Sequence, residues 1–211
     1  LTPEWEQYFQ RLLSSEPHFK GPRDALREDM IHALRLAIPP TARVLEVGVG
    51  SGATLSALPN EERVGVDILP EAIRVARGLD PTMRLSVADA LTLELGEKFD
   101  AIICDRLCHT VSDVQQLLQR LAMHLTGDGR IFMTCFNFLW SLPLGAGERL
   151  GLKVPSPREN WFSEAALADL FRLADLEVVR SDDRLLLPAR LPLASAIANR
   201  FLAKVQPTRN F

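Results

Sequence analysis

The sequence predicts an α/β protein with a doubly wound sheet: seven strands, mostly parallel, with helices on both faces and an antiparallel last strand. Two observations predict this fold. Short, nearly continuous apolar runs, typical of strands buried on both faces, alternate with stretches of helical periodicity. The first of these runs is followed at once by Gly48-Val49-Gly50-Ser51-Gly52, a spacing of glycines typical of a strand that turns tightly into a helix.

The composition is that of an ordinary globular domain. The chain has 211 residues, of which 47% are hydrophobic and 24% charged, and its formal net charge is -3. This length suits one domain with a sizeable core. No apolar run approaches the roughly 20 residues that a membrane-spanning helix needs. Nucleic-acid-binding proteins usually carry a basic surplus, which is lacking here. We therefore expect a cytoplasmic protein that binds no nucleic acid.

The cysteines suggest neither disulfides nor a metal site. Cys104, Cys108 and Cys135 are few and odd in number, which is typical of reduced thiols in a cytosolic protein. The spacing of Cys104, Cys108 and His109 is one residue too long for the usual haem-attachment pattern. A zinc site would need further ligands, and the sequence has no second cluster to supply them. No metal is expected.

The chain divides into an N-terminal helical segment over residues 1–40, which ends at Pro39-Pro40, and one domain over residues 41–211. The apolar periodicity predicts helices and strands over these ranges: helices at 4–14 and 24–37, strands at 43–47, 63–67, 84–87, 99–105 and 130–135, and helices between the strands, the longest with its apolar face from Val111 to Leu125. Gly127-Asp128-Gly129 is expected to close that longest helix.

After the fifth strand the alternation breaks. Residues 136–162 have little periodicity, and we expect them to form a lid over an acceptor site. A helix over 163–174, capped by Ser163, comes next. Residues 176–180 and 184–187 then read as two strands separated by three residues, which predicts an antiparallel hairpin.

The glycine loop and the end of the second strand suggest a nucleotide site. A strand that ends in spaced glycines lets a ligand approach the backbone, and the helix after it offers free N–H groups. Asp67, at the end of the second strand, is placed to accept both hydroxyls of a ribose, and Ile68 to pack on the base. A capping role for Asp67 before Leu69-Pro70 is compatible with this one.

Three further side chains follow the third and fourth strands. Asp89, beside Ala90, can accept a hydrogen bond from an adenine amino group, although it can also be a solvated loop residue. Asp105 ends the fourth strand, at the edge where open α/β sheets bind their ligands. His109 lies one turn later and is a candidate general base. A structural role for His109 is equally compatible with the sequence.

In this order and spacing the motifs resemble those of class I, Rossmann-like S-adenosylmethionine-dependent methyltransferases. The segments that carry the resemblance are VLEVGVGSG (44–52), VGVDILPEAIRVAR (64–77), VADA (87–90), FDAIICD (99–105) and LTGDGRIFM (125–133). By position, the resemblance implies that S-adenosylmethionine is the cofactor and S-adenosylhomocysteine the product. It further implies that Glu46, Gly48, Gly50 and Gly52 hold the methionine half, Asp67 the ribose, and Asp89 and Ala90 the adenine, with Asp105 near the acceptor.

The chain after residue 136 resembles a narrower group, bacterial methyltransferases found beside or fused to glycosyltransferases of the dolichyl-phosphate-mannose-synthase type. The resemblance is carried by residues 137–140, 147–163, 173–192 and 199–202. It implies a link to the assembly of glycans or lipid-linked glycans, and we expect the acceptor to be a small molecule, a glycan or a lipid-linked glycan. It also implies contact with a glycosyltransferase or peripheral contact with a membrane. The last amphipathic helix, expected over 193–205, can pack on the sheet, touch a membrane surface or contact a second subunit.

The sequence indicates less clearly which residues would line the site of the methyl acceptor. Asn137, Trp140, Asn160 and Trp161 are candidates to line it, while plain packing of a lid on the core is the alternative for the two tryptophans. The Asn/Asp-Pro-Pro-Tyr/Phe motif of methylases that act on adenine or glutamine amino groups is absent after the fourth strand, which argues against those acceptors.

Two other functions remain compatible with the sequence. A nicotinamide- or flavin-dependent oxidoreductase would share the loosely matching Gly48-x-Gly50-x-x-Ala53. Such an enzyme would need a catalytic tyrosine or a similar group, and the chain's one tyrosine, Tyr8, lies outside the sheet region. The second alternative is a protein that binds the cofactor, or none, without catalysis and serves as a partner of an enzyme.

Overall fold

Five parallel strands form the sheet of this computed structural model, in the order β3-β2-β1-β4-β5. The structure describes residues 2–15, 22–136 and 160–181, together with residues 141, 145, 148, 149, 156 and 157. The strands are β1 (Val44–Val47), β2 (Arg63–Asp67), β3 (Arg84–Val87), β4 (Phe99–Asp105) and β5 (Leu125–Thr134). The strand order reverses between β1 and β4, which makes their carboxyl ends the switch point where ligands of such sheets bind.

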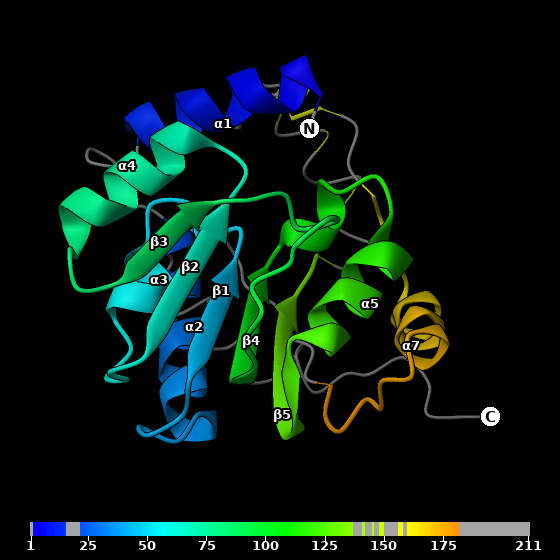
Figure 1. Cartoon of the computed structure of the whole chain (residues 1–211). Helices are drawn as coiled ribbons and strands as arrows, with labels where there is room; N and C mark the ends of the chain where they lie inside the picture. The colour runs from blue at the N-terminus through cyan, green and yellow to red at the C-terminus, as the bar shows by residue number, and fades with distance from the viewer. Residues whose placement is uncertain are drawn as a thin grey trace, which may run out of the picture.

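Helices cover both faces of the sheet (Figure 1). They are α1 (Pro3–Ser15), α2 (Pro22–Ala37), α3 (Ala53–Ser56), α4 (Pro70–Leu79), the short 3-10 helix η2 (Leu107–His109), α5 (Val114–Met123) and α7 (Glu164–Leu173). These bounds confirm the predicted helices at 4–14 and 24–37. The predicted cap of α7 is also confirmed, because the Ser163 hydroxyl oxygen accepts a 3.2 Å bond from the amide of Ala166.

Alternate residues of the central strands enter opposite cores. Val44 and Ile103 pack with α2, α3 and α4 on one face, whereas Leu45 and Ile102 pack with α5 on the other. All four side chains are fully or almost fully buried. A strand covered on both faces needs apolar residues at every position, which explains why these strands appear as unbroken apolar runs in the sequence.

The sheet differs from the seven-stranded prediction. The described residues contain five strands, all parallel. Residues 176–180, predicted as a strand, are irregular in the structure. Asp175 ends α7 in a left-handed conformation, Leu176 packs on the α5 face, and Val178 and Val179 are exposed. A strand requires a paired neighbour, and the predicted partner at 184–187 lies outside the described residues, as does the predicted helix at 193–205.

The fifth strand begins earlier than predicted. α5 ends at Met123, and β5 starts at Leu125 rather than at Arg130, so the glycines of 127–129 lie within the strand instead of closing the helix. Phe99 pairs with Leu125 and Ala101 with Arg130, so Asp100 alone faces four residues of β5. This irregularity lies at the amino ends of the strands, opposite the predicted ligand site.

The described residues contain no helix long and apolar enough to cross a membrane. They also contain no cluster of three His, Cys, Asp or Glu side chains that could hold a metal ion. Most of the predicted lid at 136–162 lies outside the described residues, so the lid stays a prediction.

Candidate functional site

The glycine loop after β1 has a backbone that only glycine adopts easily. Gly50 has φ +53°, and a Cβ built there would meet no atom within 4 Å. Gly52 has φ +80°, and its Cβ would lie 2.8 Å from the Cβ of Ala76 in α4. The two glycines therefore serve different ends: Gly52 lets α4 pack against the loop, whereas Gly50 leaves open backbone beside the carboxyl edge of the sheet. Gly48, at φ +78°, begins the same turn.

Asp67 holds this loop to the end of β2. Its Oδ2 accepts a 2.9 Å hydrogen bond from the amide of Gly50, and its Oδ1 accepts one of 2.9 Å from the amide of Leu69. Burial raises the pKa of Asp67, while hydrogen bonds from the amides of Leu69, Gly50 and Ile68 act in the opposite direction. A carboxylate has about four acceptor positions, so the two 2.9 Å hydrogen bonds from Gly50 and Leu69, even with the weaker influence of the Ile68 amide, leave an acceptor position open to a diol. The predicted capping role and the ribose role are thus compatible in geometry.

Asp89 and Ala90 lie beside Asp67 at the next strand end. β2 and β3 pair through Asp67 and Val87, and the amide of Ala88 donates a 2.9 Å bond to the carbonyl of Asp67. The half-buried Asp89 accepts a 2.9 Å bond from the amide of Leu91, which fixes the turn, and Ala90 is buried. The structure therefore brings together the residues predicted for the two halves of a nucleoside.

Glu46 is a carboxyl group buried in the middle of β1, with 2% of its surface exposed. A backbone hydrogen bond from Leu55 reaches one end of it, whereas Oε2 is buried without a hydrogen-bond partner among the described residues. Burial raises the pKa of Glu46 well above its ordinary value, and the charge of Asp105 raises it further. An unsatisfied buried oxygen is costly, and a ligand ammonium group at this edge would satisfy it. The methionine half of S-adenosylmethionine carries such a group, so this residue fits the expected cofactor.

Asp105 ends β4 on the same face of the sheet as Glu46, because Glu46 pairs with Ile103 two residues earlier. Its carboxylate accepts hydrogen bonds from the Thr134 hydroxyl and from the guanidinium of Arg106, the latter at 2.8 Å. Burial alone would raise the pKa of Asp105. The charge and hydrogen bonds of Arg106, the Thr134 hydroxyl and the charge of Arg27 outweigh burial and lower it. The pKa values of the two neighbouring carboxyl groups are therefore shifted in opposite directions.

Arg106 reaches Asp105 from a strained backbone. Its φ is +55°, in the left-handed region that costs a non-glycine residue about 1–3 kcal/mol. The amide of Arg106 donates to Thr134, through both the carbonyl and the hydroxyl oxygen. β4 and β5 thus hold Arg106 in place directly beyond the sheet edge.

His109 is buried, and backbone groups occupy both of its ring nitrogens. The amide of Phe136 donates to Nε2 at 2.8 Å, so Nδ1 carries the proton and donates to the carbonyl of Asn160 at 2.6 Å. The ring also stacks on Phe136, with its centroid 5.5 Å away. In this arrangement Nε2 has no lone pair left for a substrate proton, so the geometry favours the structural role that the sequence left open for His109.

Of the four acceptor-side candidates, Asn160 and Trp161 are described, whereas Asn137 and Trp140 lie outside the described residues. The Asn160 amide donates to the carbonyls of Cys108 and Val111, at 3.1 and 2.7 Å. Trp161 lies against His109, with ring centroids 5.7 Å apart. Asn160 therefore ties the segment before α7 to the loop that follows β4.

Sequence reasoning missed Arg27 of α2. It is half-buried, and its charge lowers the pKa of both Glu46 and Asp105. A signal was present in the sequence: Arg27 lies on the same helical stripe as Met30, Leu34 and Ile38, which pack on the sheet. A cation on the core-facing side of a helix indicates an anionic partner inside.

The comparisons with known proteins agree with this geometry. A family model described as a methyltransferase domain matches residues 19–181. A ubiquinone biosynthesis O-methyltransferase of Xylella fastidiosa is 33% identical over 104 residues, which cover 46% of this chain and 42% of that protein. The chain therefore spans less than half the length of this curated relative.

Solved structures share the fold. A SAM-dependent methyltransferase of Thermotoga maritima superposes with a TM-score of 0.66 at 22% identity, over 81% of this chain and 80% of that one. A SAM-bound amino pentose methyltransferase of Micromonospora echinaspora gives 0.50 at 26% identity, over 58% and 54%. The family match decides against the oxidoreductase alternative.

Proposed function

Because the chain belongs to the S-adenosylmethionine-dependent methyltransferases of class I, we propose that it methylates a small molecule, a glycan or a lipid-linked glycan. The identity of the acceptor is the part of this proposal that family membership does not establish. The amino pentose methyltransferase among the similar structures supports a sugar, and the ubiquinone methyltransferases among the relatives support a phenolic ring. The predicted resemblance of the C-terminal half to glycosyltransferase-associated members favours the glycan.

One observation carries the proposed cofactor site: the buried carboxyl of Glu46 with an unsatisfied Oε2, in a row with Asp67 and Asp89 at the carboxyl ends of β1, β2 and β3. Three carboxyl groups suit a cationic nucleoside. In our proposal Glu46 binds the ammonium group, Asp67 accepts from the two ribose hydroxyls with Ile68 against the base, and Asp89 accepts from the adenine amino group. Gly48, Gly50 and Gly52 allow the close approach.

The bound cofactor supplies a methyl group already activated by its sulfonium. The protein's part is to orient the acceptor and exclude water, and orientation alone can contribute roughly 7–11 kcal/mol in favourable systems. We propose that Asp105, ionised and held by Arg106 and Thr134, positions the acceptor at the switch point. His109 and Asn160 support the site by fixing the loops around it, and Asn137, Trp140 and Trp161 stay our proposed contacts with the acceptor.

Contacts with a glycosyltransferase or a membrane surface are also proposed. They rest on the apolar stripe of the sequence between 193 and 205 and on the basic residues within and around it, Arg190, Arg200, Lys204 and Arg209. A second copy of the chain is a further candidate to cover the same stripe.

The first test is ligand-dependent thermal unfolding. S-adenosylhomocysteine at about 100 times its dissociation constant should stabilise the wild type by roughly 2.7 kcal/mol, and NAD should not. Asp67→Asn should lose most of the shift, whereas Asp128→Asn, at an exposed position of β5, should keep it. Transfer of labelled methyl groups to a panel of amino sugars, neutral sugars and catechols then identifies the acceptor. A shift with NAD alone, or equal shifts in the two variants, would contradict the proposed site.

The methyl-transfer assay distinguishes an enzyme from a protein that binds the cofactor without catalysis. It would be stabilised by S-adenosylhomocysteine and would transfer no methyl group to any member of the panel.

A further inference from the structure

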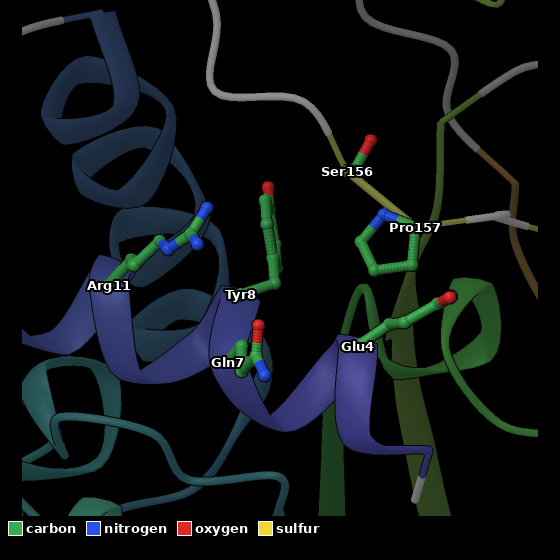
Figure 2. Close-up of a pocket in the computed structure, with 6 residues that line it drawn as sticks. All are labelled: Glu4, Gln7, Tyr8, Arg11, Ser156 and Pro157. Atoms are coloured by element: carbon green, nitrogen blue, oxygen red, sulfur yellow. The ribbon is translucent and has the colours of Figure 1, made fainter.

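A small open hollow lies between α1 and the segment at 156–157. Its volume is about 200 Å³, and it is lined by Glu4, Gln7, Tyr8 and Arg11 of α1 and by Ser156 and Pro157. Figure 2 shows the Tyr8 ring standing between the two walls, with its hydroxyl toward Ser156 and the Arg11 side chain beside it. None of these residues belongs to the motifs of the proposed cofactor site.

α1 presents two different faces. Trp5 is buried, and its ring stacks on Phe9, with centroids 5.4 Å apart, to form the apolar side of the helix. The residues that line the hollow are Glu4, Gln7, Tyr8 and Arg11, at the spacing i, i+3, i+4, i+7 of one continuous helical face. A buried aromatic side thus anchors the helix, and a polar side is turned toward the hollow.

The two walls are anchored on opposite sides of the switch point. α1 lies next to α4, which begins directly after Asp67 and β2 (Figure 1). Ser156 and Pro157 shortly precede Asn160, which is bonded to the loop after β4. The order of the sheet reverses between β1 and β4. The hollow therefore spans the edge where ligands of open α/β sheets bind.

We propose that this hollow binds one sugar ring of the methyl acceptor, an inference that rests on the proposed function. Sugar hydroxyls both donate and accept hydrogen bonds, and the lining offers an acceptor in Glu4, a donor in Arg11, and both in Gln7 and the Tyr8 hydroxyl. The flat face of Tyr8 suits the C–H side of a ring. The lining carries one acidic and one basic side chain, Glu4 and Arg11, so it has no formal surplus of positive charge for a phosphate, which favours a neutral ring.

The size of the hollow narrows the ligand further. Pockets for drug-sized ligands have volumes of roughly 300–1,000 Å³, so a hollow of about 200 Å³ accommodates a single small ring. A quinone with a long apolar tail does not match this volume. The remainder of a larger glycan would extend into solvent.

The test compares matched variants on one helix. Gln7→Ala and Glu4→Gln change the lining, whereas Gln10→Ala and Glu6→Gln make the same changes at exposed positions of α1 outside it. The probes are methyl glycosides of neutral and amino pentoses and hexoses, with 3,4-dihydroxybenzoate as the non-sugar control. Binding is followed by saturation-transfer NMR without cofactor, and labelled methyl transfer gives KM and kcat.

We expect glycoside binding to weaken about tenfold in Gln7→Ala and Glu4→Gln, the effect of about 1.4 kcal/mol for one lost hydrogen bond. The two control variants should match the wild type, and S-adenosylhomocysteine affinity should be unchanged in all four. Equal binding in lining and control variants, or no glycoside binding to the wild type, would overturn the proposal. If the wild type does not bind S-adenosylhomocysteine, the proposed function is overturned instead. The two failures are distinguishable because the NMR assay of glycoside binding needs no cofactor.

Discussion

The amide of Gly50 donates a 2.9 Å hydrogen bond to the carboxylate of Asp67, so the loop after β1 and the end of β2 are one structural unit. The same carboxylate accepts from Leu69 at the entry of α4. The residue proposed to bind the ribose therefore also sets the shape of the loop proposed to bind the methionine half. A substitution in the loop should therefore alter the proposed ribose site, and a substitution of Asp67 should alter the conformation of the loop.

Gly50→Ala and Gly52→Ala should separate ligand binding from stability. Both positions have positive φ, which costs a residue with a Cβ about 1–2 kcal/mol. Gly50→Ala should add no clash and should mainly weaken S-adenosylhomocysteine binding. Gly52→Ala should cost a further 1–3 kcal/mol, because its Cβ meets Ala76. Urea unfolding and calorimetric titration measure the two effects. Gly78→Ala, within α4 and open to solvent, is the control and should leave binding intact.

Glu46→Gln should stabilise the protein without ligand and weaken cofactor binding. The pKa of Glu46 is raised in the folded state, so its contribution to stability is complete below the ordinary value of 4.5 and is lost as pH rises toward the folded value. A neutral glutamine removes that loss. The melting temperature of the variant should therefore exceed that of the wild type increasingly from pH 5 upward. An unchanged difference across this range would contradict a buried, raised Glu46.

In the same variant, S-adenosylhomocysteine affinity should fall about tenfold or more, since a charge-assisted hydrogen bond contributes roughly 1.5–3 kcal/mol. Glu61→Gln, at an exposed position after α3, should change neither quantity.

Arg106→Ala should raise the pKa of Asp105. The pKa of Asp105 is lowered in the folded protein despite burial, because the charge and hydrogen bonds of Arg106 and the hydroxyl of Thr134 outweigh it. Stability from this group is present above the ordinary value of 3.8 and is lost as pH falls through the folded value. Raising the folded pKa removes this contribution, so the variant should be less stable than the wild type at neutral pH, and the difference should shrink as pH falls below 3.8. An acid unfolding curve identical to that of the wild type would contradict the assignment.

Arg106→Gly is the matched partner of this variant. It also removes the guanidinium but tolerates φ +55°, so it should be about 1 kcal/mol more stable than Arg106→Ala at every pH. In both variants the stability difference from the wild type should shrink in the same way on acidification.

His109→Phe should act on stability before it acts on catalysis. The substitution removes the bonds to Phe136 and Asn160 and leaves one backbone amide and one carbonyl without their partners, which costs roughly 1–3 kcal/mol for each buried group. A catalytic base would instead lower kcat by about 100-fold or more with little change in unfolding free energy. Chemical denaturation and steady-state kinetics on the same preparation distinguish the two roles, and His32→Phe on the exposed side of α2 is the control.

The sequence predicted the parts of the fold that depend on local patterns. β1 to β4 were found because strands buried on both faces are unbroken apolar runs, and Ser163 was found because an N-cap uses a local hydrogen bond. The start of β5 was missed because Gly127 and Gly129 resemble a helix end. Only the pairing of Phe99 with Leu125 shows that the strand has already begun.

In the candidate site, too, the residues that stand in local sequence motifs were predicted, whereas those placed by tertiary contacts were not. Glu46, Asp67 and Asp89 stand in recognisable motifs at strand ends. Arg27 contributes through a contact between α2 and the sheet, and Arg106 through a backbone conformation that no motif specifies. The residues that occupy both nitrogens of His109 come from segments 27 and 51 positions away, which periodicity cannot reveal.

The strand order also separates the residues proposed to bind the cofactor from those proposed to bind the acceptor. The residues proposed for the cofactor lie between Glu46 and Ala90, on three adjacent strands that are consecutive in sequence. The proposed acceptor side is assembled from α1 and from segments after Asp105. Grafting α1 and residues 136–162 of a relative onto this chain should therefore transfer acceptor preference while leaving donor affinity untouched, because no donor-binding residue lies in either grafted piece.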